Sequence, residues 1–211
     1  MKCETSMAKS ALYFFHLFSY LCSMNREITI RPATIADAEL IAEVVCMAVG
    51  YTTEHPIYPV FLELAGRDVA QYSYRNTLIA EVDGRAVGAL VGYDGARLEE
   101  LRSPIYELLE RYLGGVPDIE DETSAGEFYL DSLGVLPDYR GMGVGAVLLS
   151  TMRDMAFEQG YERVGLIVDV DNPDAERLYT SLGFSRVGNK RFLGHAMYHL
   201  QARRGEVEYG K

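Results

Sequence analysis

The sequence predicts one α/β domain built around a mixed β-sheet. Segments with strand and helix patterns follow in the order strand, helices, two strands, strand–helix twice, and two final strands. The apolar run 164–170 is typical of a strand buried on both faces. With 211 residues, 48% of them hydrophobic, the chain is long enough for one sizeable core.

The first half is expected to alternate strands and amphipathic helices. Thr34 is a plausible helix N-cap, and Asp83-Gly84 is a strong signal for a two-residue hairpin turn. The expected elements are a strand at 28–31, helices at 33–48 and 60–65, and paired strands at 77–82 and 85–93.

Residues 94–126 carry apolar side chains at helical spacing, followed by an acidic segment. Pro104 interrupts the helical pattern, and we expect it to open a second helix. The acidic segment 118–122 could attract an amine, although a solvated acidic loop is the expected role of such a charge run. We interpret 94–126 as a helical and acidic insertion in a single domain that spans 24–211.

The central stretch, Leu130 to Met152, predicts a strand, a glycine-rich loop and a helix. Alternation places Tyr129, Asp131, Leu133 and Val135 on one face of the strand, which Pro137 ends. Gly141, Gly143 and Gly145 let the backbone turn sharply just before a helix that runs to about Gln159. Because a helix N-terminus favours anions, this loop predicts a phosphate or pyrophosphate ligand.

Two other phosphate-binding motifs were weighed against this loop. A Walker loop fails because Gly145-Ala146-Val147 lacks the required Lys and Ser or Thr. A dinucleotide fingerprint fits Gly141, Gly143 and Ala146, with Asp169 at the end of the next strand. That motif opens directly off its strand, however, whereas four residues intervene here, so NAD binding is the weaker reading.

The last third predicts a strand, a helix and a closing antiparallel pair. Asn172 is a plausible N-cap for the helix, and Gly183 ends it. The expected elements are a strand at 164–170, a helix at 174–182, and strands at 184–187 and 196–201 joined by a turn at 189–194.

Composition excludes several classes of function. A net charge of −11 argues against nucleic acid as a partner and is compatible with cationic substrates. Three cysteines without a C-x-x-C pair suit a reducing compartment, so we expect a cytoplasmic protein. The histidines show no spacing typical of a metal site, so no metal is expected. The apolar run within 1–23 is too short and polar to span a membrane. We interpret 1–23 as an extension, either a mis-assigned start or an extra helix.

Two blocks resemble the GNAT superfamily, the GCN5-related N-acetyltransferases. In the first, Val135-Leu136-Pro137 is followed by Arg140, Gly143 and Gly145, which matches the family's acyl-CoA-binding signature. In the second, Asn172-Pro173 precedes Leu178-Tyr179 and Leu182-Gly183-Phe184. The resemblance covers about 28–200 and implies a mostly antiparallel sheet of six to seven strands flanked by helices. Dimers are common in that family, so a homodimer is compatible with the sequence.

The resemblance implies an N-acetyltransferase that uses acetyl-CoA as acyl donor and a primary amine of a small molecule or peptide as acceptor. An acyl-CoA-binding sensor without catalysis is the rival from another class. The residues implied in acetyl-CoA binding are Leu133, Val135, Arg140, Gly141, Met142, Gly143, Val144, Gly145, Ala146, Asn172, Ala175 and Tyr179.

The family's mechanism implies three chemical roles. In the family the central strand splays from its neighbour, which frees the backbone amide matching Val135 to polarise the thioester carbonyl. Asp131 matches one position of the family's general base; Tyr129 matches the other and is the better candidate for a wall or a water-positioning hydroxyl. Glu127 is the reserve base, and a structural role for Asp131 stays equally open. Tyr179 matches the family's general acid, which protonates the departing thiolate.

Overall fold

The computed structural model describes residues 27–206, and the expectations for 1–23 lie outside this range. One seven-stranded sheet has the order β1-β2-β3-β4-β5-β7-β6. Neighbouring strands are antiparallel except β4 and β5, which are parallel. The strands are β1 (Ile28–Pro32), β2 (Thr77–Val82), β3 (Arg85–Asp94), β4 (Phe128–Val135), β5 (Arg163–Asp169), β6 (Ser185–Phe192) and β7 (His195–Arg203).

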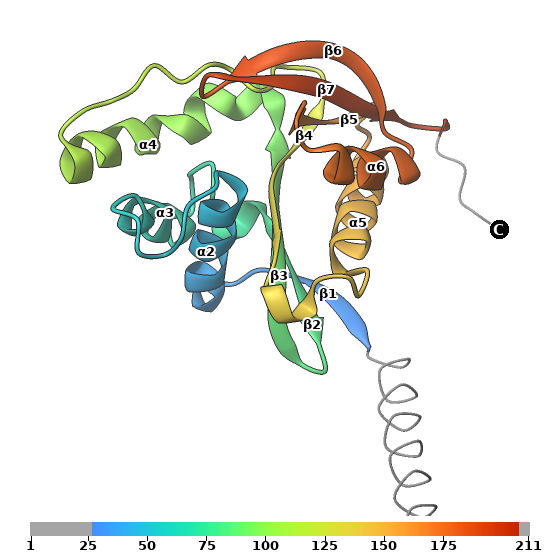
Figure 1. Cartoon of the computed structure of the whole chain (residues 1–211), viewed down its shortest axis with the longest axis horizontal. Helices are drawn as coiled ribbons and strands as arrows, with labels where there is room; N and C mark the ends of the chain where they lie inside the picture. Colours follow the sequence, from blue (N-terminus) through green and yellow to red (C-terminus); the bar gives the residue numbers. More distant parts are fainter. Residues whose placement is uncertain (1–26, 207–211) are drawn as a thin grey trace, which may run out of the picture.

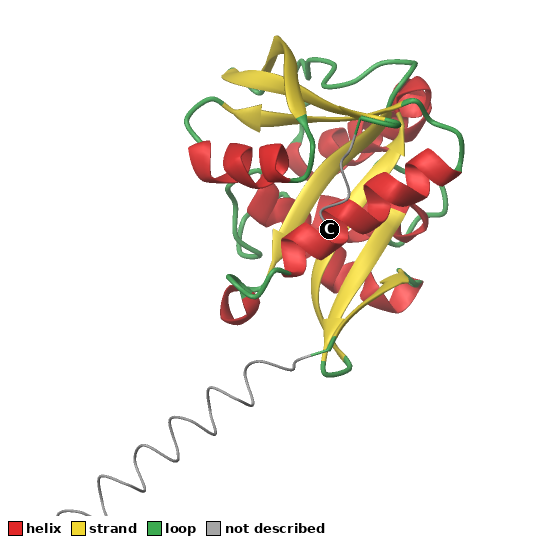
Figure 2. Cartoon of the chain, turned by 90° about the vertical axis from the view of Figure 1, so that its right-hand side faces the viewer, coloured by secondary structure: helices red, strands yellow, loops and turns green. Residues whose placement is uncertain are grey.

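Helices cover both faces of the sheet, which confirms the predicted fold class. In Figure 1, α2, α3 and α4 lie on one face, and α5 and α6 lie on the other; Figure 2 shows helices in front of the strands and behind them. Each layer buries its own apolar cluster against the strands. The helices are α2 (Ala38–Ala48), α3 (Tyr58–Ala65), α4 (Leu98–Leu113), α5 (Val144–Glu158) and α6 (Pro173–Ser181). None of the described helices has the length and apolar character needed to cross a bilayer.

Strands β4 and β5 meet only at their beginnings. Their paired positions are Phe128 with Val164 and Tyr129 with Gly165. Beyond this point β4 continues beside β3, whereas β5 pairs with β7 along its whole length (Figure 1). The sheet therefore opens between the second halves of its two parallel strands.

A bulge in β4 contradicts the regular alternation expected from the sequence. Leu90 pairs with Leu133 and Gly92 with Leu130, so one residue of β3 faces two of β4. Tyr129 consequently packs with the cluster under α2 to α4, whereas Leu133 and Val135 pack with the α5 cluster. The prediction that Tyr129, Leu133 and Val135 share one face was wrong, because the extra residue reverses the alternation.

Three further boundaries differ from expectation. A 3-10 turn, Ile35–Asp37, precedes α2, which begins five residues later than predicted. Helix α4 runs unbroken through Pro104, so the predicted second helix was wrong; burial of Leu101, Ile105 and Leu108 outweighs the lost backbone hydrogen bond. Strands β6 and β7 extend to a short turn at Leu193-Gly194, which have φ of 49° and 82°, so the predicted turn at 189–194 was too long.

Glu127 precedes β4 and is a buried structural carboxylate. Its side chain accepts hydrogen bonds from Thr123 Oγ1 (2.8 Å), His199 Nε2 (3.0 Å) and Gln201 Nε2 (2.7 Å). Gly165 lies directly beneath it, and a Cβ at this position would overlap the carboxylate. Burial alone would raise the pKa of Glu127, but these hydrogen bonds outweigh it and hold that pKa below its usual value.

Glu127→Gln is therefore expected to lower stability in a pH-dependent way. A carboxylate with a depressed folded pKa contributes stability above its unfolded pKa, about 4.3, and loses it as the pH falls through the folded value. We expect a loss of about 1–3 kcal/mol in the free energy of unfolding at pH 7. Urea unfolding at several pH values should show this difference shrinking below about pH 4. Glu110→Gln, an exposed position on α4, is the control, and a constant difference across pH would contradict the assignment.

Candidate active site

A single cleft of about 1310 Å³ extends through the opening between β4 and β5. Its walls come from the end of α2, the second half of β4, the glycine loop with the start of α5, the start of α6 and the β6–β7 hairpin. Of the predicted residues it is lined by Tyr129, Asp131, Leu133, Val135, Arg140, Gly141, Gly143, Val144, Gly145, Ala146, Asn172, Ala175 and Tyr179. Met142 is 37% exposed and is not among the lining residues, nor is Glu127.

The glycine loop forms the mouth of the cleft at the start of α5. Gly141 and Gly143 have φ of 74° and 84°, a left-handed conformation that disfavours side chains. Gly143 is the N-cap of α5, so the first N–H groups of this helix lack intrahelical partners. Arg140 folds back and donates from Nε to the carbonyl of Val135 at 2.9 Å. The loop thus combines a helix N-terminus with a cationic side chain, which suits an anion.

Helix α6 supplies the opposite wall. Asn172 caps it by accepting a hydrogen bond from the Ala175 amide at 3.1 Å, which confirms its expected capping role. Tyr179 packs edge-on against Phe184, with ring centroids 6.3 Å apart. Burial raises the pKa of Tyr179 to about 12. The phenol therefore keeps its proton at neutral pH and can act as a donor.

Asp131 lies at the inner end of the cleft, where the β4 bulge directs it. Its Oδ1 accepts a hydrogen bond from Ser132 at 2.7 Å. Its Oδ2 accepts from Gln71 Nε2 and from the Tyr93 hydroxyl, both at 2.7 Å. Asp131 is thus both fixed by its neighbours and accessible from the cleft. The two roles weighed from the sequence, structural carboxylate and base, are geometrically compatible.

Glu122 contradicts the expectation that the segment 118–122 is a solvated acidic loop. It is 2% exposed, lines the cleft and forms an ion pair with Arg102 of α4. Arg102 also binds Asp121 at 2.8 Å and donates to the carbonyls of Ile119 and Glu120. The loop is ordered because one buried guanidinium satisfies four of its residues.

Sequence reasoning missed Gln71, Tyr93 and Arg102 of this inner network, and it identified Glu122 only as part of the acidic segment 118–122 that could attract an amine. Arg102 carried the one local signal, since it falls within the apolar stripe of α4, three residues before Ile105. A charged residue at such a position needs a buried partner. The partner lies 20 residues away in the chain, and no local pattern identifies it.

The β6–β7 hairpin closes the far side of the cleft. Phe192, Leu193, His195 and Met197 line it. The Leu193 amide donates to Glu120 Oε2 at 3.0 Å, so the hairpin is tied to the acidic loop. His195 Nδ1 lies 3.0 Å from Asp169 Oδ2, at the end of β5. The hairpin and the loop therefore form one continuous rim.

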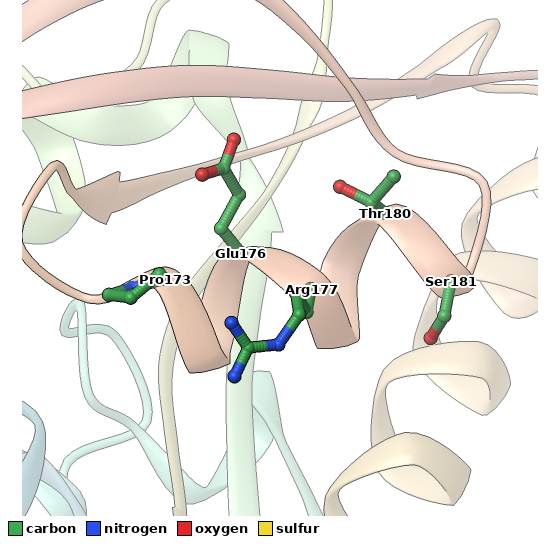
Figure 3. Close-up of a pocket in the computed structure, with 5 residues that line it drawn as sticks. All are labelled: Pro173, Glu176, Arg177, Thr180 and Ser181. Atoms are coloured by element: carbon green, nitrogen blue, oxygen red, sulfur yellow. The ribbon is translucent and has the colours of Figure 1, made fainter.

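A second hollow lies on the outer face of α6 (Figure 3). Glu176 and Arg177 point to opposite sides of the helix there. Glu176 is paired with Arg186 of β6, and Arg177 with Asp174. These ion pairs account for the charges of the hollow, and the candidate site is the cleft at β4 and β5.

Comparison with known proteins identifies the family of the chain. Residues 47–184 match the sequence profile of the acetyltransferase (GNAT) family. The chain is 35% identical to the N-alpha-acetyltransferase RimI of Mycobacterium tuberculosis, over 52% of this chain and 54% of that protein. It is 41% identical to a mycothiol acetyltransferase of Corynebacterium aurimucosum, over 31% of this chain but only 21% of that longer protein.

A solved structure matches nearly the whole described fold. It is the crystal structure of an acetyltransferase, 32% identical, with a TM-score of 0.70, and the match covers 85% of this chain and 100% of that one. The family profile spans more than half of the chain and includes the β4–α5 loop and α6. On these grounds the chain belongs to the acetyltransferase (GNAT) family.

Proposed function

We propose that this protein is an acetyl-CoA-dependent N-acetyltransferase that acts on a primary amine of a small molecule or peptide. One observation carries the proposal: a single cleft joins the glycine loop at one end to the carboxylates of Asp131 and Glu122 at the other. The loop suits the phosphates of a CoA thioester, and the carboxylates suit an amine. The gap between β4 and β5 is where the thioester of acetyl-CoA and the amine would come into contact.

Backbone geometry supports carbonyl polarisation in this gap. The Leu136 amide donates to the Val87 carbonyl at 2.8 Å, so it faces β3. Because successive residues of a strand point their amides to opposite edges, the Val135 and Leu133 amides face the side where β5 has diverged. Preorganised N–H groups of this kind stabilise the developing oxyanion of acyl transfer, and they also hold a pantetheine arm.

Proton transfer completes the proposed reaction. An alkylammonium with a pKa of about 10.4 must lose a proton before it attacks the thioester, and we assign Asp131 to receive this proton directly or through water. Tyr129, 2% exposed, acts as a wall. The nitrogen then bonds to the carbonyl carbon, the carbon–sulfur bond breaks, and Tyr179 gives its proton to the thiolate. The nitrogen loses its second proton to the Tyr179 phenolate, directly or through solvent, which restores the phenol and leaves a neutral amide.

Ligand titration tests the proposal against its two rivals. The full chain is titrated calorimetrically with acetyl-CoA, CoA and NAD, and thiol release is then measured with a panel of amines. We expect binding of both CoA species, no NAD binding, and amine-dependent thiol release. Binding without release for any amine would favour the acyl-CoA sensor. The mixed sheet already differs from the doubly wound parallel sheet of dinucleotide-binding folds, and NAD binding alone would overturn the proposal.

Gly143→Ala should weaken acetyl-CoA binding. A residue with a side chain at φ 84° is strained by about 1–2 kcal/mol. The backbone relieves this strain by rotating, which turns the amides at the start of α5 away from the phosphates of the proposed acetyl-CoA. We expect the Kd for acetyl-CoA to rise about tenfold. Gly84→Ala is a matched control, since Gly84 has φ 79° and open space around it but lies in the β2–β3 turn. Equal Kd values for both variants would contradict the loop assignment.

Tyr179→Phe should separate chemistry from binding. Loss of the phenolic proton should lower kcat by about 100-fold, because the thiolate then leaves without a proton donor. The Kd for acetyl-CoA should stay within about twofold, because the ring remains. Tyr112→Phe, an exposed position on α4, should change neither quantity. An unchanged kcat in Tyr179→Phe would remove this residue from the reaction.

A further inference from the structure

We propose that the inner end of the cleft binds the acceptor as an alkylammonium cation between the carboxylates of Asp131 and Glu122, which makes Glu122 a specificity-determining residue. This inference rests on the proposed function, because it names the class of amine that the acetyltransferase takes. An aliphatic primary amine arrives charged at neutral pH, whereas an arylamine arrives neutral. The site would therefore select between these two classes.

The two carboxylates are held together by shared donors. Gln71 Nε2 lies 2.7 Å from Glu122 Oε1 and 2.7 Å from Asp131 Oδ2. The Tyr93 hydroxyl lies 3.1 Å and 2.7 Å from the same two oxygens. The acids come from different elements, the loop after α4 and the bulge of β4, and both line the cleft. Two carboxylates so close, Glu122 buried and Asp131 half-buried, repel each other unless a cation lies between them.

The charges around the pair do not balance. Among the described residues, Arg102 is the cationic side chain that forms an ion pair with one of the two carboxylates. It pairs with Glu122 Oε2 and also with the exposed Asp121. Burial raises the pKa of Tyr72, Tyr93 and Tyr129 well above the usual value, so these neighbours are neutral. Burial together with Asp131 raises the pKa of Glu122. One guanidinium thus faces two carboxylates, the buried Glu122 and the half-buried Asp131, and a cationic ligand would offset the excess negative charge.

The acceptor atoms around Asp131 and Glu122 also favour a ligand that donates hydrogen bonds. Gln71 is 2% exposed, and its Oε1 accepts no hydrogen bond from any described residue. A carboxylate has about four acceptor sites. Asp131 accepts from three donors, on Gln71, Tyr93 and Ser132, so one of its sites is free. An ammonium group supplies three N–H donors and no acceptor. The rings of Tyr72 and Tyr129 line the same end and suit an alkylammonium by cation–π contact.

Thermal denaturation of the full chain with 1,4-diaminobutane dihydrochloride tests the proposal. Tetramethylammonium chloride at matched ionic strength is the control, because this cation has no N–H donor. A ligand that binds only the folded state raises the melting temperature progressively with its concentration, because the stabilisation grows as RT ln(1 + [L]/Kd). We expect the diamine to raise Tm by about 3 °C at roughly ten times its Kd and the control to leave it unchanged. A wild-type protein whose Tm does not rise with diamine concentration beyond the control would overturn the proposal.

Three variants assign the effect to the pair. Glu122→Gln keeps the shape of the side chain beside Arg102, and Asp131→Asn does the same at β4; each should abolish the rise in Tm. Asp118→Asn, an exposed position in the same loop, should retain it. A full rise in either Glu122→Gln or Asp131→Asn would overturn the proposal, and Asp131→Asn decides if Glu122→Gln does not fold.

Kinetics give an independent readout. In the acetyl-transfer assay, Glu122→Gln should raise the KM for an alkylamine about tenfold and leave the Kd for acetyl-CoA unchanged. Its effect on an arylamine should be small, because that acceptor carries no charge. Equal changes in KM for both amines would overturn the proposal. Acetyl-CoA binding to the wild-type protein is measured separately. If the wild-type protein does not bind acetyl-CoA, the acetyltransferase function is refuted. If it binds acetyl-CoA but the diamine does not raise its Tm, the ammonium site alone is refuted.

Discussion

The divergence of β4 from β5 is the constraint on which the rest of the structure depends. After two paired positions the strands separate, and one edge of β4 keeps amides without a strand partner. In a closed sheet these groups would be satisfied by a neighbour and the interior would be filled. Here the separation creates a cleft, and the ends of α2, α5 and α6 all open onto it. The site is therefore a consequence of incomplete strand pairing.

A second constraint fixes the inner end of this cleft. Arg102 lies on the otherwise apolar, buried face of α4. Because a buried charge is costly unless it is paired, its guanidinium requires carboxylates and carbonyls as partners. The loop before β4 provides them, and Glu122 is held at the cleft as a result. The β4 bulge brings Asp131 to the same place from the opposite side. The two features explain why an acidic loop without any motif forms part of the site.

Local patterns predicted the architecture well. The expected strands and helices occur, apart from the second helix expected at Pro104, because apolar periodicity, Asp83-Gly84, Pro137 and the glycine loop act over a few residues. The errors arose where distant packing outweighed local preference. Helix α4 continues through Pro104 because its apolar face is buried, and the β4 bulge depends on its pairing with β3. The predicted loop and α6 residues meet in one cleft, with the exception of Met142.

By itself, the sequence determined the fold class, the anion-binding loop and the family resemblance, because each depends on residues close together in the chain. Only the tertiary structure decided that Gln71, Tyr93, Glu122 and Asp131 share one buried network, since they come from four separate segments. It also decided that Glu127 is enclosed by Thr123, His199 and Gln201 rather than open to the cleft. The sequence identifies which residues carry a carboxylate, whereas long-range packing decides how deeply each one is buried and which groups it contacts.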